Sequence, residues 1–292
     1  MNEDARIARW TAGWTASKHV ILGPGDDCAL VSPPPRGHVA VLKTDSVFEN
    51  VHFSRRDPAR SVGRKALARA VSDFAASGAL PIACLVAVGT PGGRKPDPYT
   101  DHVMRGLSSA AHSWNIGLAG GETTRSKALC LTVSLYGWVK QNRHVSRSGA
   151  APGDSLFVTG KLGGSRKGHH LKFTPRLAEG QWLAEQHIPS AMMDLSDGLG
   201  KDLPRLAAAS NVSFLLRAQT LPRRAGCSVA QAVNDGEDYE LLFAVPFKNC
   251  QRLLEDWPFK TKLTWIGGII PRRHKPIARG VKLRGYDQFE SF

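Results

Sequence analysis

Residues 192–202 read MMDLSDGLGKD, an apolar run that ends in two aspartates three positions apart and is followed by a glycine. The apolar residues before Asp194 predict a buried strand, and 198–210 has the composition of a helix. A strand that carries Asp194, Ser196 and Asp197 to its C-terminal end, just before a helix N-terminus, predicts a site for cations and phosphate. The alternative is that Ser196 or Asp197 only caps the helix.

Strand-like and helix-like runs alternate along the whole chain, which predicts the α/β or α+β class. The stretch 146–160, SRSGAAPGDSLFVTG, has the composition of a linker that leads into a strand. We therefore expect a first domain over 1–148 and a second over 149–292. The expected strands are 38–45, 82–90, 128–139, 154–160, 212–218, 239–246 and 262–270. The expected helices are 61–77, 98–113, 177–187, 198–210 and 248–257.

The composition of the chain is that of a soluble globular protein, with 42% hydrophobic and 22% charged residues in 292. This length suffices for two domains, each with its own core. No apolar run is long enough to span a membrane, and MNEDARIARW lacks the form of a secretory signal. The five cysteines have no CxxC spacing, which favours a reducing compartment. We expect a cytoplasmic protein without a disulfide framework.

The formal net charge of +14 predicts a surface that attracts anions such as phosphorylated metabolites, nucleic acid or anionic lipid. The basic residues are spread along the chain, and no nucleic-acid-binding motif accompanies them. A solvated basic surface explains most of them, so we expect no specific nucleic acid and no membrane as partner.

Further carboxylates occur beside glycines or hydroxyl residues, in GPGDDCALV (23–31), AVLKTDSV (40–47), GLAGGETTRS (117–126) and the helix-like RKALARAVSDFAASGA (64–79). Carboxylate and hydroxyl oxygens are the ligands that Mg²⁺ prefers, and glycines let backbone N–H groups approach phosphate. Each residue has a plainer explanation as a turn, strand-end or surface residue. For Asp73 this is an ion pair along one helix face with Lys65 and Arg69. A Walker A motif is missing, so a nucleotide site here is of another type.

Eight stretches together resemble the thiamine-monophosphate kinase family, within the aminoimidazole ribonucleotide synthetase superfamily. In chain order they are GPGDDCAL, TDSVFENVHF, KALARAVSDFAASGA, GGETTRS, SRSGAAPGDSLFVTGKLGGS, MDLSDGL, GEDYELLFAVP and GYDQF. The resemblance implies two domains, each a mixed sheet flanked by helices, and a homodimer formed through the first domain. It implies direct transfer of the ATP γ-phosphoryl group to thiamine monophosphate, with several Mg²⁺ ions and no covalent phospho-enzyme.

The resemblance also assigns roles to individual residues. The metal ligands it implies are Asp27, Thr44, Asp45, Asp73, Glu122, Asp194 and Asp197. The ATP contacts it implies are Gly121, Glu122, Arg147 and Ser196. The contacts to thiamine monophosphate are His52, Glu237 and Tyr286, of which Tyr286 could stack on a cationic ring and Glu237 could face its charge.

The sequence departs from the family pattern at four places. Glu122 replaces an aspartate, Asp235 stands where glycine is usual, and the stretch after Ser165 is too short for a helix that the family carries. Lys43 stands where a small hydroxyl residue is usual. Because side chains alternate along a strand, Lys43 and Asp45 should point the same way. The ammonium should then compete with one Mg²⁺ or serve as the fixed substitute for that ion, and the alternative is that it turns away to solvent.

Two other classes of function fit parts of the pattern. A sister synthetase, such as selenophosphate synthetase or the hydrogenase-maturation dehydratase, shares the superfamily but needs a reactive cysteine near the N-terminus or at the C-terminus. A degenerate paralogue would bind nucleotide or nucleic acid through its basic surface without kinase activity. Steep salt dependence of binding to random DNA would favour this last class.

Overall fold

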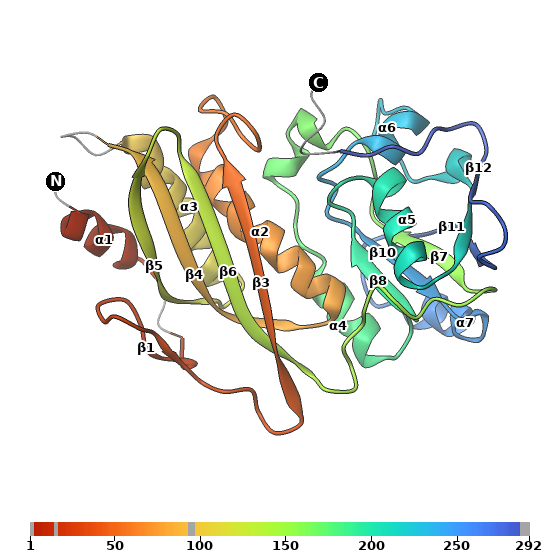
Figure 1. The fold of residues 1–292 in the computed structure, drawn as a ribbon, viewed down its shortest axis with the longest axis horizontal. Coiled ribbons are helices and arrows are strands. Elements are labelled where there is room, and N and C mark those ends of the chain that lie inside the picture. The colour runs from red at the N-terminus through yellow and green to blue at the C-terminus, as the bar shows by residue number, and fades with distance from the viewer. Residues whose placement is uncertain (1–2, 15–16, 93–96, 287–292) are drawn as a thin grey trace. The chain divides into compact units, whose positions relative to one another are not determined.

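The computed structural model describes residues 3–14, 17–92 and 97–286 (Figure 1). The boundary between its two compact units lies between 141 and 142, whereas the sequence predicted one between 148 and 149. The first unit consists of Met1–Phe74 and Ala79–Gln141, and the second of Ala75–Gly78 and Asn142–Phe292.

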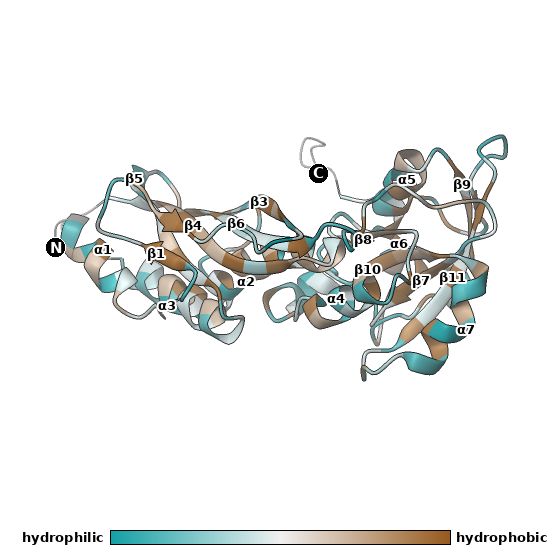
Figure 2. Ribbon diagram, turned by 90° about the horizontal axis from the view of Figure 1, so that it is seen from below, coloured by the Kyte–Doolittle hydropathy of each residue, from teal (hydrophilic) through white to brown (hydrophobic). Residues whose placement is uncertain are grey.

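A four-stranded mixed sheet is the centre of the first unit. The elements in this part of the chain are α1 (Glu3–Thr11), β1 (Val20–Leu22), β2 (Leu30–Val31), β3 (His38–Phe48), α2 (Ala59–Ser77), β4 (Leu80–Pro91), α3 (Pro98–Ser113), β5 (Gly117–Ser126) and β6 (Cys130–Lys140). The sheet has the order β3-β6-β4-β5, with β5 parallel to β4 and the other pairs antiparallel. The helices α2 and α3 lie along one face of it (Figures 1 and 2).

Local sequence signals set these elements. In β3, Val41, Lys43, Asp45 and Val47 are less exposed than most of the residues between them, as expected for a strand that is covered on one face. Asp97 caps α3, since its side chain accepts the backbone N–H of Tyr99 at 3.2 Å, and Pro98 starts the helix where no N–H is needed. Leu67 and Val71 of α2 are fully buried, so the helix is stabilised mainly by apolar burial against the sheet.

A six-stranded sheet is the centre of the second unit, in the order β12-β9-β11-β7-β10-β8. All neighbouring pairs are antiparallel except β12 and β9. The elements are β7 (Ser155–Thr159), η1 (Ser165–Lys167), η2 (His169–Leu171), α4 (Leu177–Glu185), β8 (Ala191–Asp194), α5 (Leu199–Ala209), β9 (Ser213–Leu216), η3 (Ala218–Thr220), α6 (Val229–Asn234), β10 (Leu241–Val245), α7 (Phe247–Asp256), β11 (Leu263–Ile270) and β12 (Ile277–Ala278).

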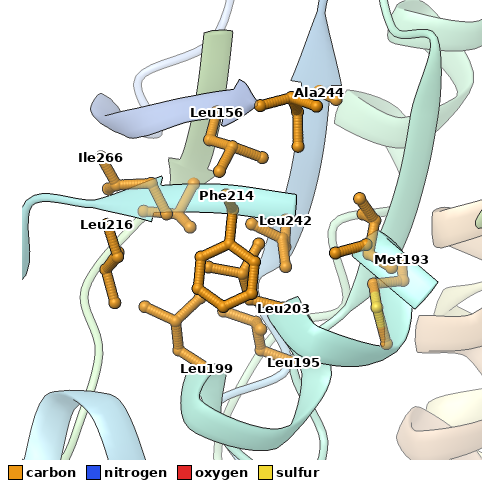
Figure 3. Close-up of a cluster of buried hydrophobic side chains, with 14 of the residues drawn as sticks. Leu156, Met193, Leu195, Leu199, Leu203, Phe214, Leu216, Leu242, Ala244 and Ile266 are labelled. Atoms are coloured by element: carbon orange, nitrogen blue, oxygen red, sulfur yellow. The ribbon is translucent and has the colours of Figure 1, made fainter. Parts of the chain in front are cut away.

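Alternate residues of the central strands pack into two cores, one on each face of this sheet. In β10, Leu242 and Ala244 join the core that contains the α5 leucines, and Figure 3 shows Leu199 and Leu203 pointing toward Phe214 in that core. Leu241, Phe243 and Val245 join the other core, with residues of α4 and α7. The strands of the second unit are therefore apolar on both faces, and they read as continuous hydrophobic runs in the sequence.

The mixed α/β class and every strand and helix expected from the sequence are confirmed, with ends shifted by a few residues. The elements that the sequence did not predict are α1, β1, β5, α6, β12 and the 3₁₀ helices η1, η2 and η3. Among the described residues, no helix is both long and apolar enough to cross a membrane.

Candidate functional site

A cavity of about 1110 Å³ opens in the first unit, and three of the predicted site residues, Asp27, Gly121 and Glu122, line it. Its wall also holds the hydroxyl residues Thr132 and Ser134 of β6. The sequence had not singled out these two. Carboxylate and hydroxyl oxygens around one cavity suit a hydrated cation and the phosphate groups that it accompanies.

Thr44 reaches this wall through a hydrogen bond between its Oγ1 and Ser134 Oγ, at 2.9 Å. The next hydroxyl on the same face, Ser46 Oγ, lies 2.8 Å from Thr132 Oγ1. The expectation that the strand ends at Thr44 and Asp45 is wrong, because β3 continues to Phe48. Hydrogen bonds between these hydroxyl groups stabilise the pairing of β3 with β6 where the sequence is polar, so the strand continues beyond Asp45.

The Asp45 side chain lies on the opposite face of β3 from that of Thr44 and points toward α2. There Lys43 Nζ lies 2.9 Å from Asp73 Oδ2 and 3.4 Å from Asp45 Oδ2. Arg69 of α2 approaches the second oxygen of Asp45 at 3.6 Å. The prediction that Lys43 and Asp45 point the same way is confirmed. The predicted ligands of the first unit therefore form two groups, one at the cavity and one that surrounds the Lys43 ammonium.

Glu122 and Gly121 lie within the edge strand β5. A Cβ atom at position 121 would overlap the carbonyl oxygen of Val86 on β4. The close approach of these two strands therefore requires a glycine, whatever binds in the cavity.

His52, a predicted substrate contact, lies in the turn after β3. Its Nδ1 accepts the backbone N–H of Phe48 at 3.1 Å, and its carbonyl oxygen accepts a hydrogen bond from Lys65 Nζ at 2.7 Å. Lys65 is fully buried. It thus fixes the turn that carries His52, and this is a different role from the surface ion pair considered for that helix face.

Residues 192–202 form the end of a strand and the start of a helix in the second unit, as expected. Asp194 is the last residue of β8 and is buried, and α5 begins at Leu199. Neither Ser196 nor Asp197 caps that helix, because its N-cap is Gly198, with a φ of 95°. Any side chain there would be strained and would press on the backbone at 234–235, so glycine is required.

Two backbone hydrogen bonds bring the predicted nucleotide, metal and substrate residues of this unit together. The Glu237 N–H donates to the Ser196 carbonyl at 2.7 Å, and the Tyr286 N–H donates to the Asp197 carbonyl at 2.8 Å. Lys201 Nζ donates to the Tyr286 carbonyl at 2.7 Å. The segments around 196, 237 and 286, distant in the sequence, therefore meet at one place.

Two side chains that the sequence analysis did not identify, Arg166 and His170, face the predicted substrate residues. The Arg166 guanidinium lies over the Tyr286 ring, 4.8 Å from its centre. His170 Nδ1 lies 3.4 Å from the Glu237 carboxylate. Both come from the short stretch after Ser165, which forms the 3₁₀ helices η1 and η2. The aromatic face of Tyr286 thus already attracts a cation of this chain.

The carboxylates at the start of α5 share one arginine. Arg205 Nη1 lies 2.6 Å from Asp197 Oδ2 and 2.9 Å from Asp202 Oδ1, and the Asp197 N–H donates to Asp202 Oδ2 at 2.9 Å. Burial, and next to it the charge of Asp197, raise the pKa of Asp202 to about 6 even though Arg205 opposes the shift. Arg205 therefore stabilises two like charges beside the predicted metal ligand Asp197.

The acidic loop NDGEDYEL (234–241) holds the glycine loop that follows β7. Asp235 Oδ2 accepts the Gly164 N–H at 2.8 Å, and both oxygens of Asp238 accept the Gly163 N–H at 3.1 Å. Asp235, which stands where glycine is usual, has a φ of −69° and therefore does not need the conformational freedom of glycine. Glu237 has the left-handed angle instead, with a φ of 64°. Such strain in a non-glycine residue is typical of functional sites.

Arg147, the predicted ATP contact of the second unit, is exposed, and its carbonyl accepts the Ser210 hydroxyl at 3.1 Å. Within residues 3–14, 17–92 and 97–286, no three His, Cys, Asp or Glu side chains come together as a group that could hold a metal ion. The single cluster of seven metal ligands therefore stays a prediction.

The chain is similar in sequence and in fold to known proteins. Residues 25–139 match the family of AIR synthase related protein, N-terminal domain. The thiamine-monophosphate kinase of Rhodopirellula baltica is 33% identical, and the match covers 87% of this chain and 84% of that protein. The crystal structure of thiamine-monophosphate kinase from Stenotrophomonas maltophilia is 30% identical, with a TM-score of 0.80, over 98% of this chain and 97% of that one.

A solved structure of AaThiL complexed with AMPPCP and TMP is 28% identical, with a TM-score of 0.74, and the match covers 98% of this chain and 96% of that one. The fold is that of the AIR synthase-like proteins. With relatives above 30% identity matched over most of their length, the chain belongs to the thiamine-monophosphate kinase family.

Proposed function

We propose that this protein transfers the γ-phosphoryl group of ATP directly to the phosphate of thiamine monophosphate, giving thiamine diphosphate. The observation that carries the proposal is the meeting of the segments around Ser196, Glu237 and Tyr286 in the second unit, in a chain of this family. The AaThiL complex with AMPPCP and TMP supports the choice of both reactants.

Mg²⁺ is the ion that the cavity residues fit. Asp27 and Glu122 line the cavity of the first unit together with Asp26 and four hydroxyl residues, and hard oxygen donors are what this ion requires. We propose that Asp27 and Glu122 hold Mg²⁺ there, and that Asp194 and Asp197 are metal ligands within the second unit. When bound, the ion supplies positive charge that neutralises the phosphate groups of both reactants.

The chain's own residues supply binding and orientation. The Tyr286 ring already stacks against the Arg166 guanidinium, so its face is suited to the positively charged thiazolium ring of the substrate. We propose that the Glu237 carboxylate, whose backbone N–H is bonded to the Ser196 carbonyl, balances that charge. Reactants held in line need little more than this positioning, and no nucleophilic side chain is required.

We further propose a homodimer formed through the first unit. The sheet face that carries Thr44 also carries the exposed side chains of Leu42 and Leu85, and exposed apolar surface favours association. The mass of the protein in solution, measured by light scattering, tests this; a monomeric mass at micromolar concentration contradicts it.

The test of the function is the formation of thiamine diphosphate from ATP, Mg²⁺ and thiamine monophosphate by the purified protein. We expect product only when all three are present. ATP hydrolysis without thiamine diphosphate would contradict the proposal and favour a sister synthetase. Steeply salt-dependent binding to random DNA without turnover would favour a paralogue that has lost the activity.

A further inference from the structure

Lys43 connects two carboxylates that come from different elements of the first unit. Its ammonium lies 2.9 Å from Asp73 on α2 and 3.4 Å from Asp45 on the same strand. The Lys43 side chain is 31% exposed, and those of Asp45 and Asp73 are 19% and 22% exposed. The alternative that this lysine turns away to solvent is therefore wrong.

The surroundings of these carboxylates are already rich in positive charge. Arg69, from the turn of α2 that precedes Asp73, lies 3.6 Å from the second oxygen of Asp45. Two cationic side chains thus approach the two carboxylates, so the net charge of the four groups is near zero. A divalent ion entering between Asp45 and Asp73 would have to displace the ammonium or lie beside it, and like charges at such distances repel strongly.

We propose that the Lys43 ammonium is a permanent cation of this site, which holds Asp45 and Asp73 together in place of one divalent ion. The inference rests on the proposed function, because it concerns carboxylates that would otherwise bind Mg²⁺ beside ATP. The gap between these two carboxylates does not fit a further ion, whereas the cavity at Asp27 and Glu122 does. Lys43 is thus a positioning residue whose charge sets how many divalent ions bind with nucleotide.

The experiment counts the Mn²⁺ ions bound per chain in the presence of AMPPCP, by electron paramagnetic resonance titration of free Mn²⁺. Two variants remove the ammonium: Lys43→Ser, and Lys43→Met, which keeps most of the length of the side chain for packing. Lys43→Arg keeps the charge. Lys140→Ser is the matched control, since Lys140 is exposed at the far end of the strand that pairs with β3.

We expect Lys43→Ser and Lys43→Met each to bind one more Mn²⁺ per chain than the natural protein. Lys43→Arg and Lys140→Ser should bind the same number as the natural protein. Equal counts in all five proteins would overturn the inference. A gain in Lys43→Ser alone would also overturn it, because the serine hydroxyl and not the lost charge would then be responsible.

Turnover of the natural protein, measured in the same buffer, separates this inference from the proposed function. An additional ion in both neutral variants without any thiamine diphosphate would refute the kinase proposal and leave the role of Lys43 standing. Thiamine diphosphate formation with equal ion counts would do the reverse.

Discussion

Replacing Arg205 by methionine should destabilise the second unit more at pH 8 than at pH 5. Arg205 Nη1 lies 2.9 Å from the fully buried Asp202 and 2.6 Å from Asp197. A pair of charges near 4 Å attracts by about 4 kcal/mol at an effective dielectric constant of about 20. The arginine side chain is 41% exposed, and solvent screening reduces the expected loss to about 2 kcal/mol at pH 8.

The pH dependence follows from the raised pKa of Asp202, about 6 in the fold against 3.8 for an ordinary aspartate. The folded state therefore binds a proton more tightly than the unfolded state, so the ionised carboxylate lowers the free energy of unfolding above pH 6. At pH 5 the carboxyl is mostly neutral and has less need of the arginine. At pH 5 the decrease in the free energy of unfolding in Arg205→Met should therefore be only about 0.5 kcal/mol, which is the contribution of the remaining exposed pair with Asp197.

Hydrogen–deuterium exchange of peptides that cover α5, at both pH values, measures this loss within the second unit. Arg252→Met is the control, because the Arg252–Asp256 pair is exposed at both ends, and it should cost under about 0.5 kcal/mol at either pH. Equal losses in Arg205→Met at pH 5 and pH 8 would refute the reasoning that Arg205 acts by stabilising the ionised Asp202.

Three further changes have definite expected outcomes. Tyr286→Ala should raise KM for thiamine monophosphate more than KM for ATP, because stacking acts in binding; equal effects in steady-state kinetics would mean that the ring only packs the chain end. Asp73→Asn should lower kcat about a hundredfold in a folded protein, because the Lys43 ammonium of the site loses the carboxylate nearest to it, and near-normal turnover would contradict this. Burial, with nearby cations, lowers the pKa of His169 to about 4, so the free energy of unfolding should fall as the pH drops from 6.5 to 4. In His169→Phe this fall, measured by urea titration, should be smaller by up to about 3 kcal/mol.

The sequence predicted the elements whose stability is local or follows from an apolar face. Both α2 and β10 are examples, because their buried residues recur with the period of a helix or fill a continuous strand. By contrast, α1 is held by contacts distant in the sequence: Trp10 Nε1 donates to Asp101 at 2.8 Å, across 91 residues. No local pattern contains such a contact.

The strand β5 was missed for a related reason. Its sequence, GLAGGETTRS, is rich in glycine and polar residues, which have low strand propensity. It is nevertheless a strand because it pairs along its length with the apolar β4. The same limit applies to the site. Motif spacing found Asp27 and Glu122, which meet at one cavity, but the positions of Arg166 and Arg205 depend on how loops and helices close up in three dimensions.

The hydrogen bonds at Ser196 and Asp197 join main chain to main chain, so they do not depend on which side chains stand at Glu237 and Tyr286. Because carbonyl and N–H groups hold the segments at 196, 237 and 286 in place, a new side chain at Glu237 or Tyr286 leaves that framework intact. Mutations there alter what is recognised before they alter whether the chain folds. This part of the molecule can therefore acquire a preference for a different phosphorylated substrate through single substitutions, and a library restricted to these two positions is a rational place to select for one.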